Sequence, residues 1–365
     1  MKLREHLARR LGMPVRLPAG DARGHDLQVM LDGASLRVYS ERTSLTLSAE
    51  ALGSAFLLPA ASMGRAIAGD TVDAKWLAGA QRILALAHTW WGWPVRSPRF
   101  TPRSGEIPPR APTGLAFSLG VDSFYSCFFA DPQPDLLILA GGYDVPFERL
   151  DVLASMQDSV AEVAASTGKD WTMIATNLRQ HELYRSTSWD VTHGGALAFL
   201  GHLLEEHIGT LLISSSVDEH HLRPWGSHPD LDPFWSSSRV AIRHVGQEVS
   251  RAEKVRRLLQ HPVAARLMQR HLRVCYEFPS AKGNCGRCHK CVLMRINLHR
   301  DMPGFKLETM PEPVPLVEAI QMLPALTNIL SLDLRKELLG CPDPRVEKAL
   351  RDLIRRSEET ISSGS

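Results

Sequence analysis

The chain has 365 residues, of which 44% are hydrophobic and 22% charged. This is the composition of an ordinary globular protein, and it excludes a wholly disordered, a collagen-like or a coiled-coil chain. With 42 Lys and Arg against 40 Asp and Glu, the net charge is only +2, so charge gives no reason to expect a protein that coats nucleic acid or a membrane surface.

The sequence also gives no sign of a membrane or export segment. It contains no apolar run of about 18 residues, so we expect no membrane-spanning helix and no membrane partner. Arg9, Arg10 and Pro14 interrupt the N-terminal segment, which therefore does not resemble a secretory signal. We expect a cytoplasmic protein.

The first 110 residues predict a small N-terminal α+β domain and linker. Residues 26–47 alternate apolar and polar side chains around Asp32 and Gly33, which predicts a β-hairpin. Residues 49–68 and 73–91 have helical spacing. Residues 96–113 contain five prolines and little apolar periodicity, so they are the best candidate for a domain boundary.

The next block, residues 111–305, alternates short apolar strands with helices. This order predicts an α/β fold with a parallel sheet that carries helices on both faces. The remaining residues, 306–365, predict a C-terminal helical tail. The expected strands are 114–118, 135–140, 171–176 and 210–215; the expected helices are 122–130, 147–167, 194–207, 247–272 and two or three within 313–361.

The loop after the first strand of this block is a candidate phosphate site. Residues 118–123 read Ser-Leu-Gly-Val-Asp-Ser and open a helix, whose N-terminal N–H groups suit a phosphate. Gly120 allows a close approach or a positive φ, Ser118 and Ser123 offer hydroxyls, and Asp122 can hold Mg²⁺ or cap the helix. A capped turn without a ligand is an equally good interpretation of these six residues alone.

This segment resembles the SGGxDS signature of the PP-loop (N-type) ATP pyrophosphatases. The resemblance implies that ATP binds with its phosphates around Ser118, Leu119, Gly120, Val121, Asp122 and Ser123, with Mg²⁺, and that pyrophosphate leaves as AMP is transferred to an acceptor oxygen. Leu119 stands where that family usually has glycine.

Four of the six cysteines, Cys275, Cys285, Cys288 and Cys291, lie within 17 residues. Two consecutive CxxC steps with one upstream cysteine are typical of a tetrahedral structural zinc site. An iron–sulfur cluster is the main alternative.

Together the two motifs resemble the 7-cyano-7-deazaguanine synthase family over roughly residues 114–300. The resemblance places His193 and Gly194 in the nucleotide site, Trp225, Ser227, His228 and Asp232 in a substrate loop, and Arg251 and Lys254 beside the leaving pyrophosphate. The N-terminal domain, the tail and a different pocket loop mark the chain as a divergent relative.

Two further polar segments follow core strands. Asn177, after the third strand, is a candidate contact to the nucleotide, with a hydrogen-bonded loop as the alternative. Residues 218–221, Asp-Glu-His-His, together with His228, Asp230 and Asp232, suggest either a second metal site or merely a polar loop. The polar loop is favoured, because the histidines lack i, i+4 spacing.

From these features we expect an ATP-dependent ligase, which uses ATP, Mg²⁺ and Zn²⁺ and forms AMP and pyrophosphate. It would adenylate a carboxylate or amide oxygen of a small, 7-deazaguanine-like acceptor or of one attached to a macromolecule. The catalytic residues would be Asp122, Ser123, Arg251 and Lys254. A nucleotide sensor or complex subunit, and a tRNA sulfur-transfer enzyme, are the rival functions. A protein partner at the N-terminal domain, a homodimer and nucleic-acid binding are left open.

Overall fold

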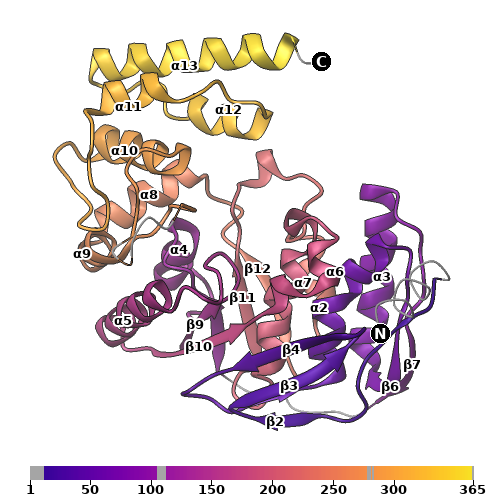
Figure 1. The fold of residues 1–365 in the computed structure, drawn as a ribbon. Coiled ribbons are helices and arrows are strands. Elements are labelled where there is room, and N and C mark those ends of the chain that lie inside the picture. Colours follow the sequence, from indigo (N-terminus) through magenta and orange to yellow (C-terminus); the bar gives the residue numbers. More distant parts are fainter. Residues whose placement is uncertain (1–11, 105–111, 278–280, 282, 364–365) are drawn as a thin grey trace.

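The computed structural model describes residues 12–104, 112–277, 281 and 283–363, and its central feature is a seven-stranded sheet (Figure 1). The strand order is β12-β11-β8-β9-β10-β4-β3. Five neighbouring strands run parallel, and β4 and β3 are antiparallel additions at one edge. These strands are β3 (Asp26–Leu31), β4 (Ala34–Tyr39), β8 (Thr113–Ala116), β9 (Leu136–Gly141), β10 (Asp170–Thr176), β11 (Thr210–Ser214) and β12 (Ala241–Val245).

The fold is therefore α/β, as predicted, but its sheet is mixed instead of purely parallel. The predicted hairpin at Asp32 and Gly33 forms, yet it joins the central sheet: Tyr39 of β4 pairs with Ala175 of β10. The N-terminal block and the α/β block thus share one sheet. Strand β12, which was not predicted, pairs with β11 at the opposite edge.

Helices cover both faces of the sheet. Alternate side chains of one strand enter different cores: Leu212 packs in one, and Leu211 and Ile213 in the other. The helices α4 (Val121–Phe129), α5 (Leu150–Thr167), α8 (Arg251–Gln260) and α9 (Pro262–His271) contribute to the first core. The opposite core contains α2 (Ala49–Ser62), α3 (Ala74–Trp91) and α7 (Trp189–Leu203).

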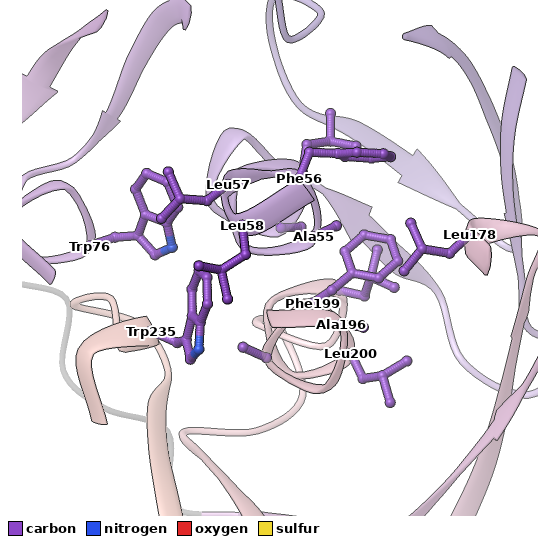
Figure 2. Close-up of a cluster of buried hydrophobic side chains, with 14 of the residues drawn as sticks. Ala55, Phe56, Leu57, Leu58, Trp76, Leu178, Ala196, Phe199, Leu200 and Trp235 are labelled. Carbon is purple, nitrogen blue, oxygen red and sulfur yellow. The ribbon is translucent and has the colours of Figure 1, made fainter. Parts of the chain in front are cut away.

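Helices α2 and α7 pack against each other and join the N-terminal block to the rest of the chain. Figure 2 shows Phe56 and Leu58 of α2 in one cluster with Phe199 of α7. All three side chains are fully buried, and burial of each is worth about 1.5–3 kcal/mol. Gly195 of α7 allows the approach, because a Cβ there would lie only 2.5 Å from the carbonyl oxygen of Ser54. The N-terminal helices are thus part of the main core.

Smaller elements complete this half of the molecule. A three-stranded parallel sheet has the order β1-β6-β7, and a two-stranded sheet joins β2 to β5. Strand β7 lies inside the segment that was predicted as a linker. The bounds are β1 (Val15–Arg16), β2 (Ala22–Gly24), β5 (Leu45–Leu47), β6 (Ile67–Asp73), β7 (Arg99–Arg103), η1 (Leu178–Gln180), α6 (Glu182–Arg185), η2 (Glu219–His221) and η3 (Asp232–Trp235).

The C-terminal part is helical, as predicted. Helices α11 (Leu316–Met322), α12 (Ile329–Lys336) and α13 (Pro344–Ser363) pack with α10 (His289–Asp301) around a third core (Figure 1). The single helix predicted over residues 247–272 is two helices, α8 and α9. The chain breaks before Pro262, because proline lacks the N–H that a continuing helix needs and its ring clashes with the preceding turn, whereas proline is tolerated as the first residue of α9. In the described part of the chain, no helix is long and apolar enough to cross a membrane.

Candidate functional site

A cavity of about 260 Å³ lies at the carboxyl ends of the parallel strands β8, β9 and β11. Ligands of open parallel sheets bind at this end of the strands. The polar and aromatic side chains that line it come from the loop after β8 and the start of α4, the loop after β9, α7, the end of β11 and its loop, α8, the segment before α10, and α10 itself. They are Phe117, Ser118, Asp122, Ser123, Tyr143, Asp144, Trp189, His193, Ser214, Ser216, Arg251, Arg273, Tyr276, Lys290 and Asn297.

The loop at residues 118–123 has an unusual backbone turn. Leu119 has a φ of +63°, a left-handed conformation that costs an L-residue roughly 1–2 kcal/mol. Its side chain is fully buried beside Phe117 and Phe124, which offsets that cost. Gly120 takes an ordinary φ of −80° as the N-cap residue of α4, so of the two roles predicted for it the positive φ is not used, and the left-handed residue is Leu119.

The two serines of this loop help to hold its shape. Ser123 Oγ donates to the carbonyl of Gly120 at 3.0 Å and accepts from the Ser118 N–H at 3.3 Å. Gly120 leaves room for the turn, since a Cβ there would lie 3.2 Å from Ser118 Oγ. The N-terminus of α4 therefore faces the cavity through a compact loop that offers backbone N–H groups to an anion.

Asp122, in the first turn of α4, is bound by two cations of α8. Arg251 Nη2 donates to its Oδ2 at 2.6 Å, and Lys254 Nζ lies 3.3 Å from its Oδ1. Burial opposes ionisation of this carboxyl, but the charges of Arg251 and Lys254 outweigh it and lower the pKa of Asp122. Three of the four side chains predicted as catalytic, Asp122, Arg251 and Lys254, therefore meet, with Asp122 holding both cations rather than capping its helix, while Ser123 bonds within its own loop.

Lys254 is the less accessible of the two cations. Its side chain is 1% exposed, and Nζ also donates to the carbonyl of Ser215 at 2.7 Å. Arg251 is 20% exposed and lines the cavity, and its buried Nε has no hydrogen-bond partner in the described part of the molecule. Arg251 is thus the better placed of the pair to meet an anionic ligand.

Two more cations line the cavity, and the sequence analysis did not identify either as a ligand contact. Arg273 is 7% exposed, and neither its Nε nor its Nη1 has a hydrogen-bond partner among the described residues. Its Nη2 donates to Ser155 Oγ and to the Ala281 carbonyl. Because burial without a carboxylate partner disfavours the charge, the pKa of Arg273 is lowered.

Lys290 is the second unexpected cation. It lies between Cys288 and Cys291 in the sequence, and its Nζ is 3.3 Å from the ring centroid of Tyr276. Burial, together with the nearby charge of Arg251, lowers the pKa of Lys290 to about 8. The CxxC spacing indicates a role for the cysteines, but it gives no sign that the lysine between them faces the cavity.

Aromatic side chains form another wall of the cavity. Trp189 and Tyr143 meet edge to face with ring centroids 5.3 Å apart, and Arg179 stacks 4.5 Å from the Trp189 ring. His193, one turn along α7, lines the cavity as expected, and burial lowers its pKa so that the neutral ring is favoured. This wall offers a flat surface for a planar ring.

Several predicted ligand contacts lie elsewhere. Asn177 joins the sheet edge to the N-terminal hairpin, since its amide accepts from the Arg37 N–H and donates to the Ser35 carbonyl. Gly194 is buried against the Gly226 backbone, where a Cβ would lie 1.9 Å from the Gly226 carbonyl oxygen. Both residues have structural contacts instead of facing the cavity.

The predicted substrate loop also lies outside the cavity lining. Asp232 is fully buried and hydrogen-bonded to Ser227 and His244, each at 2.7 Å. His228 packs against Trp90 of α3 with ring centroids 5.0 Å apart. The ring of Trp225 meets the ring of His193 edge to face, with centroids 6.3 Å apart. Through this contact the loop touches a residue that lines the cavity.

The four clustered cysteines come together as predicted. Sγ of Cys275 lies 3.9 Å from Sγ of Cys288, and Sγ of Cys285 lies 3.8 Å from Sγ of Cys291. All four sulfur atoms are within 4.8 Å of one another, so the group could hold a metal such as zinc. Gly286 allows the turn between the cysteines through its φ of +73°.

Comparison with known proteins adds no family assignment. No protein-family model matches the chain, and no match was found among curated proteins or solved structures.

Proposed function

We propose that the chain is an ATP-dependent ligase of the 7-cyano-7-deazaguanine synthase type, which forms AMP and pyrophosphate. The observation that carries the proposal is the ion pairing of Asp122, in the residue 118–123 loop, with Arg251 at the cavity wall and with the buried Lys254. A helix N-terminus and two cations from another helix are the groups that would stabilise a leaving pyrophosphate.

The remaining groups of the cavity fit the same reaction. The aromatic wall at Tyr143 and Trp189 suits a planar base, and Arg273 and Lys290 add positive charge for an anionic acceptor or for phosphates. Mg²⁺ would offset phosphate charge, with Asp144 as the cavity carboxylate not held by Arg251 and Lys254. Attack of a carboxylate or amide oxygen on the α-phosphorus would release pyrophosphate and leave an adenylated acceptor.

The rival functions receive different support. A sulfur-transfer enzyme needs a reactive thiol at the cavity, yet Cys127 is buried outside the lining, and burial raises its pKa to about 11. A nucleotide sensor is favoured by one observation, the contact of each oxygen of the Asp122 carboxylate with a cation, because Arg251 and Lys254 would compete with Mg²⁺ for that carboxylate.

Binding and turnover, measured together, test the proposal. We expect ATP to bind in calorimetric titrations and expect pyrophosphate release to require an acceptor, with a 7-deazaguanine carboxylic acid as the first probe. Arg251→Ala should reduce pyrophosphate release at least tenfold. Arg256→Ala removes an exposed arginine of the same helix and should have little effect. ATP binding without pyrophosphate release in the presence of the acceptor would favour the sensor, and absence of ATP binding would refute both.

A further inference from the structure

A second group of metal-ligating side chains lies outside the cysteine cluster. Asp218 and His221 belong to the turn after β11, and Glu337 follows the last residue of α12 in the C-terminal helical part. One ligand atom of each lies within 4.8 Å of the other two. The three side chains therefore bring together segments that are far apart in the sequence.

The individual distances suit a shared ion. His221 Nδ1 lies 2.7 Å from Asp218 Oδ1 and 3.6 Å from Glu337 Oε1. Ligand atoms around one zinc ion sit about 2.0–2.2 Å from the metal, so two of them can be at most about 4.4 Å apart. The 2.7 Å contact is a hydrogen bond, which an ion bound by the same two atoms would replace, and small movements of the three side chains would then bring them into a common coordination sphere.

The backbone already fixes two sides of this group. Asp218 Oδ1 accepts the N–H groups of His220 and His221, which holds the turn η2. The carbonyl of Glu337 accepts from Arg300 Nη1 at 2.9 Å, which holds the end of α12 against α10. Little reorganisation is needed for these residues to bind an ion.

The charges of the group also favour a cation. The side chains are mostly buried, with exposed fractions of 10% for Asp218, 19% for His221 and 21% for Glu337. Burial and the neighbouring charge of Asp218 raise the pKa of Glu337, even though His221, Arg251 and Arg300 act in the opposite direction. A divalent ion between the two carboxylates would remove their repulsion.

We propose that Asp218, His221 and Glu337 form a binding site for a divalent transition-metal ion, Zn²⁺ or Mn²⁺. One imidazole and two carboxylates are the donor set that these ions accept. The bound ion joins the loop after β11, which continues from the cavity residue Ser216, to the C-terminal helices. It acts as a clamp between these two parts of the molecule, and this inference does not depend on the proposed ligase activity.

Metal binding by the full-length protein tests the clamp. The protein is first loaded with zinc at the cysteine cluster, and equilibrium dialysis against MnCl₂ or ZnCl₂, without nucleotide, then measures the additional metal bound. We expect one further ion per chain in the wild type, and at least about tenfold weaker binding in Asp218→Asn and Glu337→Gln. Glu219→Gln is the matched control, because it removes the same charge from an exposed neighbour of Asp218.

A second readout reports on the clamp itself. The additional ion should slow amide hydrogen exchange in α12 of the wild type and of Glu219→Gln, and should leave α12 of Glu337→Gln unchanged. Circular dichroism of each variant without added metal verifies that it is folded. If the wild type binds neither Mn²⁺ nor Zn²⁺ beyond the cysteine cluster, or if Glu337→Gln binds as well as the wild type, the proposal is refuted.

Discussion

The carbonyl of Leu119 accepts a hydrogen bond from the N–H of Arg273 at 2.9 Å. This bond joins the loop that begins α4 to the segment that enters the cysteine cluster. The accepting residue, Leu119, is the one with the left-handed φ. The same segment then contributes Arg273 and Tyr276 to the cavity. The candidate nucleotide loop and the candidate metal site are therefore one connected unit.

The left-handed conformation of Leu119 predicts that a glycine at this position is more stable than an alanine, although glycine is normally the more destabilising substitution. Leu119→Ala keeps the strain of a positive φ and loses about 3 kcal/mol of burial. Leu119→Gly loses slightly more side chain but relieves the strain, so we expect it to be about 1 kcal/mol more stable than the alanine variant. Urea unfolding of the two proteins measures the difference. An alanine variant that equals or exceeds the glycine variant in stability would contradict the left-handed turn.

The cysteine cluster predicts that removing one of its thiols causes the protein to lose both a bound metal ion and thermal stability. Cys288→Ser should abolish zinc retention through gel filtration and lower the melting temperature, because metal binding contributes to folding free energy in such sites. Cys341→Ser is the control, since Cys341 is buried in the C-terminal core away from the cluster. Elemental analysis measures the zinc. Full zinc retention in Cys288→Ser, or iron in the wild type, would disprove the assignment.

The close contact between Gly194 of α7 and the Gly226 backbone predicts that adding one methyl group at Gly194 strongly destabilises the protein. Gly194→Ala would place Cβ 1.9 Å from a backbone oxygen, so we expect destabilisation of about 3 kcal/mol. Gly201→Ala, in the same helix, meets only Leu211 and Ile242 side-chain atoms at 3.1 Å and gains helix propensity, so its cost should stay within about 1 kcal/mol. Thermal unfolding compares the two. Equal stability of both variants would argue against the close packing.

The burial of His202 predicts that the free energy of unfolding is lower in mild acid than at neutral pH. His202 is fully buried, with its Nε2 2.9 Å from the Trp235 carbonyl oxygen, and burial lowers its pKa. In the unfolded chain a histidine takes up a proton near pH 6.5, so the free energy of unfolding should fall as the pH drops through that value. His202→Gln should reduce this loss, as measured by urea midpoints at pH 7.5 and 5.5. The exposed His220→Gln is the control, and an unchanged pH dependence in His202→Gln would contradict the prediction.

The local pattern of the sequence was enough to predict most core elements. Strand β9 and helix α5 have apolar residues at the spacing that burial requires, and both form where expected. Strand β12 was missed because Arg243 and His244 interrupt its apolar pattern at the sheet edge. The pairing of Tyr39 with Ala175 joins distant segments, and no local periodicity encodes such a partner.

The same contrast holds for the candidate site. The loop at Asp122 and the four cysteines follow short motifs whose chemistry is visible in the spacing, and each assembles in the structure. Asn177 also follows a core strand, but its strand lies next to the added hairpin, which takes up the side chain. Arg273 has no motif of its own, and only the folding of its segment across the loop brings it to the cavity.

The packing of α2 on α7 has a consequence for the chain as it leaves the ribosome. Phe56 and Leu58 are synthesised long before Phe199, which lies in the same buried cluster of the finished protein (Figure 2). The hairpin edge at β4 stays open until β10 has emerged, and the apolar helix α2 stays uncovered until α7 has followed. Exposed surfaces of this kind bind chaperones or one another. Fragments that end before Trp189 are therefore expected to aggregate, whereas the full chain buries both surfaces at once.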